Sequence, residues 1–419
     1  MSCFSVNGSH KLHGEVTVHG AKNSVLPLLS AAFLIKGKSV LHNCPKLSDV
    51  QVSINILECL GCKCQREGDV IIIDSENACG NTIPEALMRE MRSSFVFMGA
   101  IVGRCQKAVM SLPGGCELGP RPVDIHIDAL KRFGASFEFD SGNIVCNMPN
   151  GCIGSEINLK FPSVGATENC MLAAVLGKGT TIIKNAACEP EIVDLAMFLN
   201  KAGAKILGAG SSTVIIDGVK MLHSVEHTVM PDRIVAATYL FGVALCKGRI
   251  LLKNAVPEHI SPIISCLSDC GCNIAFDDNN LMLSCHSRLN GFDTISTGPY
   301  PGFPTDAGPL LVAMSTVSKG TSVFVENIFD NRFRYVDELK RMGANVKTVG
   351  RVAIVNGVDR LHGAQLRADD LRGGAALLIA SMAAKGNSIL FNTEYVDRGY
   401  QNFEDMFNIL GADIKRIRE

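Results

Sequence analysis

The pattern of apolar and polar positions predicts an alternation of strands and amphipathic helices. Between residues 190 and 202 the apolar side chains recur at helical spacing, which places on one face Ile192, Leu195, Ala196, Leu199 and Ala202. An apolar, strand-like run begins at Lys178, before this helix. Gly203 follows the helix, where a glycine C-cap is expected, and the chain then restarts as a strand. The segment therefore predicts strand, helix, strand and then further strand material.

This unit recurs six times, at intervals of 66 to 72 residues. Its first landmark is a lysine turn followed by an apolar run, as in KGTTIIKN or KGRILLKN, and it starts at Lys36, Lys107, Lys178, Lys247, Lys319 and Lys385. Its second landmark is the glycine that ends the helical segment: Gly61, Gly134, Gly203, Gly271, Gly343 and Gly411. Coincidental lysine–glycine turns would not reproduce both landmarks six times. Six units in 419 residues predict two α/β domains with three repeats each.

Composition narrows the class of protein. Hydrophobic residues make up 47% and charged residues 19% of the chain, as in a globular protein with ample core material. The net charge of −1, from 40 basic and 41 acidic residues, excludes bulk attraction to nucleic acid or anionic membrane, so an anionic ligand must meet a local cluster of Arg and Lys. The apolar runs 25–35 and 375–384 are too short to span a bilayer, and the start MSCFSVNGSHK does not have the form of a secretory signal. We expect a cytoplasmic protein with neither a nucleic acid nor a membrane as partner.

The 17 cysteines predict reduced thiols that serve mainly as small buried side chains. Two clusters, 59–64 and 266–272, have spacings that zinc could use. In the repeat register, however, Cys62 and Cys272 stand where other units carry Ala135, Ala204, Ala344 and Ala412. They replace small core residues, so we interpret them as structural and expect no metal site.

The usual nucleotide-binding and hydrolase motifs are missing from the sequence. It contains no G-x-x-x-x-G-K-[ST], no H-E-x-x-H and no G-x-S-x-G. The run GAGSST at 208–213 resembles a phosphate loop, but it lies between two strand-like runs and does not open a helix. A hairpin is the better interpretation.

One loop carries the best candidate nucleophile or acid. Six of the ten residues from Pro113 to Pro122 are Gly or Pro, between a strand-like run ending at Leu112 and a helix beginning near Asp124. Cys116 lies in this loop near Arg121, and a nearby guanidinium would favour its thiolate form. A passive loop cysteine is the alternative.

Several charged residues lie at unusual places. Lys22 and Asn23 lie at the start of an apolar helix, Ser24–Leu34, where the helix dipole favours a bound anion. Arg332 and Arg398 occupy equivalent strand-to-helix loops, so their guanidinium groups could converge on a phosphate or a carboxylate. Asp306 lies in a stretch rich in Pro and Gly, which suits a fixed general base. Taken singly, the arginines could be solvated surface charges and Asp306 a turn residue.

Motifs along the whole chain resemble those of one family. They are AKN at 21–23, MRSS at 91–94, LPGGCELGPRPVDIH at 112–126, FPSVGATEN at 161–169, EPEIVD at 189–194, PDRI at 231–234, FPTDA at 303–307, NRF at 331–333, DLR at 370–372 and DRGY at 397–400. In this order they resemble the UDP-N-acetylglucosamine 1-carboxyvinyltransferases, the enolpyruvyl transferases that commit the sugar nucleotide to peptidoglycan, cell wall biogenesis and hence cell division. The motif around the loop cysteine is highly specific to this branch.

The resemblance implies a two-domain inside-out α/β barrel, the enolpyruvyl transferase fold, with six pseudo-repeats, three per domain. Residues 22–230 would form the domain that carries the Cys116 loop. Residues 1–21 plus 231–419 would form the second domain, with the active site in the cleft between the two. No cofactor and no obligate protein partner are expected.

The implied reaction transfers the enolpyruvyl group of phosphoenolpyruvate to the sugar 3-hydroxyl and releases phosphate, by addition and then elimination. Cys116 would protonate C3 of the enol and could form a covalent adduct, which also makes it the expected target of the epoxide antibiotic fosfomycin. Asp306 would accept the hydroxyl proton, and Lys22 would complete the catalytic set.

The implied ligand contacts fall into two sets. Phosphoenolpyruvate would be bound by Lys22, Asn23, Arg121, Arg332, Arg372 and Arg398. UDP-N-acetylglucosamine would be bound by Arg92, Arg121, Pro122, Val123, Asp124, Ile125, His126, Ser163, Val164, Gly165, Asp306 and Ile328.

Four positions depart from the family pattern, but none of them removes a proposed catalytic group. Phe161 replaces a lysine of some members, Gly308 a common Gln, Gly373 a common Ala, and Cys188 a frequent basic residue. Two other functions stay open as alternatives. One is the sister transferase acting on shikimate 3-phosphate, which lacks the cysteine loop. The other is a non-catalytic sugar-nucleotide sensor, which would be expected to lose one of the residues retained here.

Overall fold

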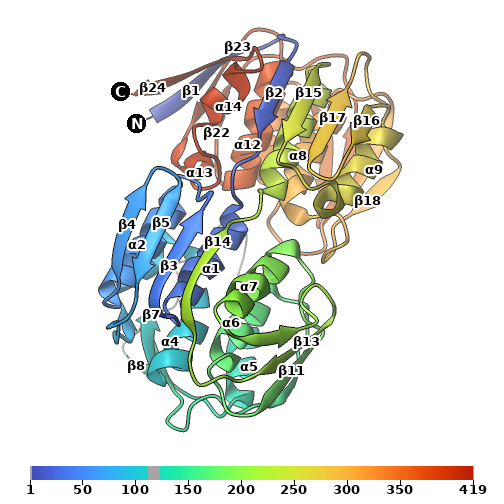
Figure 1. The fold of residues 1–419 in the computed structure, drawn as a ribbon. Coiled ribbons are helices and arrows are strands. Elements are labelled where there is room, and N and C mark those ends of the chain that lie inside the picture. Colours follow the sequence, from blue (N-terminus) through green and yellow to red (C-terminus); the bar gives the residue numbers. More distant parts are fainter. Residues whose placement is uncertain (1, 112–122, 141, 419) are drawn as a thin grey trace. The chain divides into compact units, whose positions relative to one another are not determined.

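The computed structural model describes residues 2–111, 123–140 and 142–418. These residues group into two compact units, each shown in Figure 1: one contains 2–19 and 231–418, and the other 20–111 and 123–230. Each unit contains three four-stranded sheets, so the described chain has the six α/β repeats that the landmarks predict.

Each repeat builds its sheet in the same way. In the third repeat, β10 (Glu156–Asn158) leads through α6 (Val164–Ala174) to β11 (Thr180–Lys184), which pairs parallel with β10. The outer helix α7 (Pro190–Lys201) then leads to β12 (Lys205–Leu207) and β13 (Thr213–Asp217), which form an antiparallel hairpin on β11. Residues 208–212 connect the two hairpin strands, so the hairpin interpretation of GAGSST is confirmed.

The unit formed by 20–111 and 123–230 contains two further repeats. The first has α1 (Lys22–Ala32), β3 (Lys36–His42), α2 (Ser48–Cys59), β4 (Lys63–Glu67) and β5 (Val70–Asp74), and its parallel partner strand is β14 (His223–Thr228). The second has β6 (Thr82–Ile83), α3 (Glu85–Glu90), the 3₁₀ helix η1 (Arg92–Val96), α4 (Phe97–Cys105), β7 (Lys107–Ser111), α5 (Asp124–Arg132), β8 (Ser136–Asp140) and β9 (Asn143–Asn147).

The other unit combines the two ends of the chain. Its first repeat has β2 (His13–Thr17), α8 (Arg233–Leu245), β15 (Arg249–Lys253), η2 (Pro257–Ile260), α9 (Ser261–Asp269), β16 (Asn273–Phe276) and β17 (Asn280–Ser284). Its second has β18 (Thr294–Ser296), η3 (Thr305–Ala307), α10 (Gly308–Ser315), β19 (Thr321–Val325), α11 (Tyr335–Arg341), β20 (Asn345–Val349) and β21 (Val352–Asn356). Its third has β22 (Gln365–Arg367), α12 (Leu371–Ala383), β23 (Asn387–Phe391), α13 (Glu394–Asp397), α14 (Phe403–Asn408), β24 (Asp413–Arg418) and, from the start of the chain, β1 (Ser2–Asn7). Strand β1 lies between β23 and β24 and pairs antiparallel with both.

Helices fill the centre of each unit because they are apolar on every side. In the unit that holds both ends of the chain, α8, α10 and α12 pack on one another, and residues 234–245, 308–315 and 372–382 are all buried. Outside them, α8 packs on β15 and β17, α10 on β19 and β21, and α12 on β1 and β23. The other unit has its own core, in which α4 and α6 pack together. Helices therefore lie inside and sheets outside.

The local predictions are confirmed in detail. All six helix-ending glycines have a positive φ, between 91° and 105°, which is the left-handed conformation that a C-cap glycine supplies. Helix α1 runs from Lys22 to Ala32, two residues earlier at each end than predicted, so Lys22 is its first residue. Cys62 and Cys272 are buried, as structural thiols should be. No helix in the described part of the chain is long and apolar enough to cross a membrane.

Candidate active site

Asp306 lies just before the central helix α10, in the short helix η3, and is held by two buried arginines. Its Oδ1 accepts a hydrogen bond from Nη2 of Arg332 at 3.1 Å, and its Oδ2 accepts one from Nη2 of Arg372 at 2.9 Å. The side chain of Asp306 is 27% exposed, while those of Arg332 and Arg372 are 2% and 6% exposed. Each carboxylate oxygen is thus fixed by a different guanidinium group, and the aspartate side chain is more exposed than either arginine.

Local structure fixes both arginines. Arg332 also donates to the carbonyl of Thr305 at 3.0 Å, and its guanidinium carbon lies 5.5 Å from the centre of the Phe329 ring. Arg372 is the second residue of α12, whose first turn is capped by Asp370: Oδ1 accepts the backbone N–H of Arg372 at 2.9 Å and that of Gly373 at 3.0 Å. Both cations are therefore part of the scaffold and not flexible surface groups.

The environment keeps Arg372 charged. Burial lowers the pKa of this guanidinium, but the negative charge of Asp306 opposes that effect, followed by contributions from Tyr400 and Asp232, and the pKa rises above its usual value. Nη1 of Arg372 donates to the hydroxyl of Tyr400 at 3.3 Å. Arg398 is half-buried and lies two residues before Tyr400 in the loop that follows α13. Of the predicted site residues, the structure thus brings Arg332, Arg372 and Asp306 together, whereas the convergence of Arg332 with Arg398 stays a prediction.

Lys22 begins α1 in the other unit and is paired with an acid that sequence analysis missed. Its Nζ lies 2.7 Å from Oδ2 of Asp49, which is in the first turn of α2, and the two side chains are 10% and 3% exposed. A lysine at the positive end of a helix dipole is unfavourable, and Asp49 offsets that cost. Asn23, the next residue, is half-buried. A carboxylate thus lies at the place where an anion was predicted to bind.

Two of the segments predicted to bind the sugar nucleotide meet at His126. This residue lies in α5, and a Cβ atom added to Gly165 in α6 would lie only 3.0 Å from Cε1 of its ring. Ser163 is the N-cap of α6, with its hydroxyl accepting the backbone N–H of Ala166 at 3.4 Å. The glycine therefore lets the ring approach the first turn of the helix, and residues 123–126 and 163–165 form one surface.

The imidazole of His126 is neutral at pH 7. Its Nδ1 accepts a hydrogen bond from the Asn169 side-chain amide at 2.8 Å, and its ring meets that of Phe95 edge-on at 5.1 Å. Burial lowers the pKa of His126 to about 4. The free nitrogen, Nε2, thus carries a proton and can donate to an acceptor. Asn169 was not predicted as a site residue.

Other predicted residues are placed less completely. Cys116, Arg121 and Pro122 lie outside the described residues, as does the side chain of Arg92. Val123, Ile125, Val164 and Ile328 are half-buried and Asp124 is exposed, with the N–H of Ile328 bound to Oε1 of Glu326 at 2.7 Å. Ile328 belongs to the unit that contains Asp306. The unit that contains Lys22 includes Val123, Asp124, Ile125 and Val164.

Two of the four family departures have a structural explanation. A Cβ atom at Gly308 would lie 2.6 Å from Cζ of Phe324, so the ring of Phe324 occupies the space of a side chain at position 308. A Cβ at Gly373 would lie 2.6 Å from Oδ2 of the capping residue Asp370. Phe161 is 41% exposed, and the thiol of Cys188 faces the carbonyl of Ala186 at 3.7 Å. The structure gives no reason for these last two substitutions.

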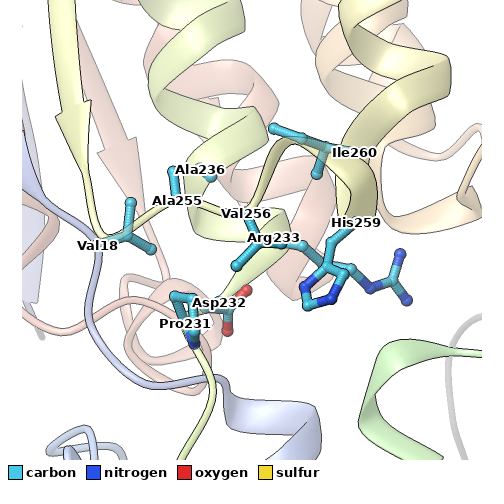
Figure 2. A pocket seen from close by; sticks show the side chains of 9 residues that line it. All are labelled: Val18, Pro231, Asp232, Arg233, Ala236, Ala255, Val256, His259 and Ile260. Carbon is cyan, nitrogen blue, oxygen red and sulfur yellow. The ribbon is translucent and has the colours of Figure 1, made fainter. Parts of the chain in front are cut away.

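A narrow hollow adjoins the start of α8, and it is too narrow to hold a water molecule. Figure 2 shows its lining, which comes from Val18, Pro231, Asp232, Arg233, Ala236, Ala255, Val256, His259 and Ile260. Asp232 caps α8, accepting the N–H groups of Ile234 and Val235 at 2.9 and 3.0 Å. Among the residues that the structure describes, no group of three or more His, Cys, Asp or Glu side chains could hold a metal ion.

The inside-out repeats are those of the enolpyruvyl transferase fold, and the family comparison shows that the chain belongs to that class of enzymes. A family model described as EPSP synthase (3-phosphoshikimate 1-carboxyvinyltransferase) matches residues 6–407. The solved structure of the enolpyruvyl transferase NikO from Streptomyces tendae superposes with a TM-score of 0.89, covering 99% of this chain and 98% of that one at 23% identity, which shows the fold.

Within this class, two curated relatives identify the branch. UDP-N-acetylglucosamine 1-carboxyvinyltransferase 2 of Caldanaerobacter subterraneus subsp. tengcongensis is 49% identical, with both chains covered in full. UDP-N-acetylglucosamine 1-carboxyvinyltransferase 1 of Symbiobacterium thermophilum is 46% identical over 99% of this chain and 95% of its own. The chain belongs to the UDP-N-acetylglucosamine 1-carboxyvinyltransferase family, so the predicted family, fold and enzyme class are confirmed.

Proposed function

We propose that the protein transfers the enolpyruvyl group of phosphoenolpyruvate to the 3-hydroxyl of UDP-N-acetylglucosamine and releases phosphate, the first committed step of peptidoglycan synthesis. The full-length similarity to relatives of that name carries this proposal. The arrangement of Asp306 between two buried arginines supports it, because the reaction needs a fixed proton acceptor near bound anions.

The proposed roles are those that the family resemblance implies, and the charge and exposure of the described residues support them. Arg332 and Arg372 would bind the carboxylate of phosphoenolpyruvate, while Lys22, Asn23, Arg121 and Arg398 would bind the rest of this anion. Asp306, whose side chain is partly exposed, would accept the proton of the sugar hydroxyl. The surface formed by residues 123–126 and 163–165, together with Arg92 and Ile328, would bind the nucleotide sugar.

The proposed chemistry balances in two steps. First the sugar oxygen bonds to C2 of the enol, Cys116 gives a proton to C3, and Asp306 takes the hydroxyl proton, which produces a tetrahedral ketal phosphate. Then the bond from C2 to the phosphate oxygen breaks, a proton leaves C3, and the enol ether and phosphate result. The domains 22–230 and 1–21 plus 231–419 would enclose these steps in the cleft between them and exclude water.

Two further proposals concern context. We place the enzyme in the cytoplasm, because the 16 cysteines of the described residues are all free thiols, as in a reducing compartment. Its partners would be the two small-molecule substrates.

Phosphate release from phosphoenolpyruvate tests the proposal, measured with UDP-N-acetylglucosamine, without an acceptor, and with shikimate 3-phosphate. Release that depends on the sugar nucleotide, with a product heavier by the enolpyruvyl group, is expected. Asp306→Asn, which keeps the shape and removes the base, should lower turnover strongly. Release with shikimate 3-phosphate would support the sister reaction. Binding of both substrates without turnover would support the sensor.

A further inference from the structure

A directed chain of hydrogen bonds runs behind the candidate site, from Arg372 into the centre of α8. Nη1 of Arg372 donates to the hydroxyl of Tyr400 at 3.3 Å, and that hydroxyl lies 2.8 Å from Oγ1 of Thr238. Oγ1 of Thr238 in turn donates to the carbonyl of Ile234 at 2.8 Å. Because the only proton of Thr238 is used there, the Tyr400 hydroxyl must donate to Thr238 and accept from Arg372.

In this chain of hydrogen bonds, Tyr400 accepts from Arg372 and donates to Thr238, and Thr238 accepts from Tyr400 and donates to Ile234. All of the side chains are buried: Tyr400 is 1%, Thr238 0% and Arg372 5% exposed. The guanidinium carbon of Arg372 also lies 5.6 Å from the centre of the Tyr400 ring, so the ring fixes the plane of the cation as well as one of its nitrogens. Water cannot easily replace a lost member at this depth.

Arg372 is thus held at two ends. Nη1 is fixed by Tyr400, and Nη2 contacts Oδ2 of Asp306 at 2.9 Å. Asp306 is also hydrogen-bonded by Arg332. Within the described part of the chain, by contrast, Nη1 of Arg372 has only the Tyr400 hydroxyl as its hydrogen-bond partner. The arginine therefore depends more on the tyrosine than the aspartate does.

The negative charge of Asp232 affects two members of this hydrogen-bond chain. Asp232, the cap of α8 visible in Figure 2, raises the pKa of both Arg372 and Tyr400. Burial is the first cause of the raised pKa of Tyr400, which keeps its hydroxyl protonated and able to donate. The phenol is thus a neutral hydrogen-bonding group and not an acid.

We propose that Tyr400 is a positioning residue that holds Arg372, through the Tyr400–Thr238 hydrogen bond, at the orientation needed to bind the carboxylate of phosphoenolpyruvate. This rests on the proposed function. Loss of the Tyr400 hydroxyl would leave Nη1 of Arg372 buried without an acceptor, so the guanidinium of Arg372 would shift more than the carboxylate of Asp306. The effect should therefore appear in the binding of phosphoenolpyruvate and not of the sugar nucleotide.

Tyr400→Phe tests the proposal, with steady-state kinetics in both substrates. The KM for phosphoenolpyruvate should rise about ten- to a hundredfold, as for loss of one hydrogen bond to a charged group, with the KM for UDP-N-acetylglucosamine within about twofold of wild type. A merely structural defect would lower the active fraction, and hence kcat, without changing either KM.

Two further variants make the test specific. Tyr239→Phe is the matched control, because Tyr239 is a buried neighbour of Thr238 whose ring packs on Phe407 at 5.3 Å, and it should keep wild-type kinetics. Thr238→Val should raise the KM for phosphoenolpyruvate, and Thr238→Ser, which keeps the hydroxyl, should restore it. An unchanged KM in Tyr400→Phe overturns the inference. Absence of transfer by the wild-type enzyme instead overturns the proposed function.

Discussion

Gly308, a departure from the family pattern, offers the sharpest test of the packing described above. Gly308 begins α10 with a helical φ of −53°, where replacing glycine with alanine normally stabilises a protein by about 0.4–1 kcal/mol. Here the added Cβ would lie 2.6 Å from Cζ and 3.0 Å from Cε1 of Phe324. Carbon atoms pack at about 3.5–4.0 Å, so the contact is too short by about 1 Å.

The ring cannot move aside easily. Phe324 is fully buried, and its ring meets those of Phe303 and Phe333 edge-on, each at 6.2 Å. We expect Gly308→Ala to reduce the free energy of unfolding by about 1–3 kcal/mol, the usual cost of overpacking. Because Asp306 lies two residues before, the same shift should move its carboxylate and reduce turnover.

Urea unfolding followed by circular dichroism measures the effect, since the chain has no tryptophan to report by fluorescence. Gly298→Ala is the control, because a Cβ there meets nothing within 4 Å and the variant should be neutral or slightly more stable. Phe324→Leu in the Gly308→Ala background should recover at least half of the loss in a double-mutant cycle. If Gly308→Ala stabilises the protein as much as Gly298→Ala does, the overpacking argument is wrong.

Three other predictions concern the site residues. Cys116→Asp should keep turnover and escape alkylation by fosfomycin, since a carboxylic acid can donate a proton but attacks epoxides poorly; mass spectrometry showing labelling at the wild-type rate would contradict this. Asp49→Asn should destabilise the enzyme by about 3–5 kcal/mol, because the buried charge of Lys22 then lacks its carboxylate partner. Phosphoenolpyruvate should raise the melting temperature of this variant more than that of wild type, because its anionic groups would replace the lost carboxylate. Equal shifts in melting temperature would refute a shared anion site. The pKa of His126 is lowered from 6.5 to about 4, so below pH 6.5 the unfolded chain binds a proton that the folded chain does not. The free energy of unfolding should therefore fall by up to about 3 kcal/mol between pH 6.5 and 4. In His126→Gln the fall over the same pH range should be smaller.

The repeat architecture could be predicted because its landmarks are local. A glycine with positive φ at the end of each outer helix is required by backbone geometry alone, so Gly203 and its five equivalents are visible in the sequence. The asparagine that ends several of the repeated strands was in the same motif, but its role was not recognised. Asn185 donates to the carbonyl of Leu159 at 2.8 Å, and Asn254 to that of Val18 at 2.9 Å, which ties each parallel partner strand to its neighbour.

The partners of the site residues could not be predicted in the same way. Lys22 was found from its place at a helix start, but Asp49 comes from the next helix, and nothing in its own segment marks it as the partner. Tyr400 and Thr238 are separated by 162 residues and meet because the segment after α13 packs in the same core as α8. Such contacts depend on tertiary structure and leave no periodic signal in the chain.

The position of β1 between β23 and β24 has a consequence for biosynthesis. Residues 20–111 and 123–230 belong to one unit and precede residue 231, so this unit can fold while the ribosome is still translating the second half. The unit that carries Asp306 cannot be completed at that time, because β1 precedes the other unit in the sequence and must wait for β23 and β24 to be made before it is paired on both sides. The nascent chain therefore carries an exposed strand edge throughout its synthesis, and any factor that shields such edges would act on residues 2–7.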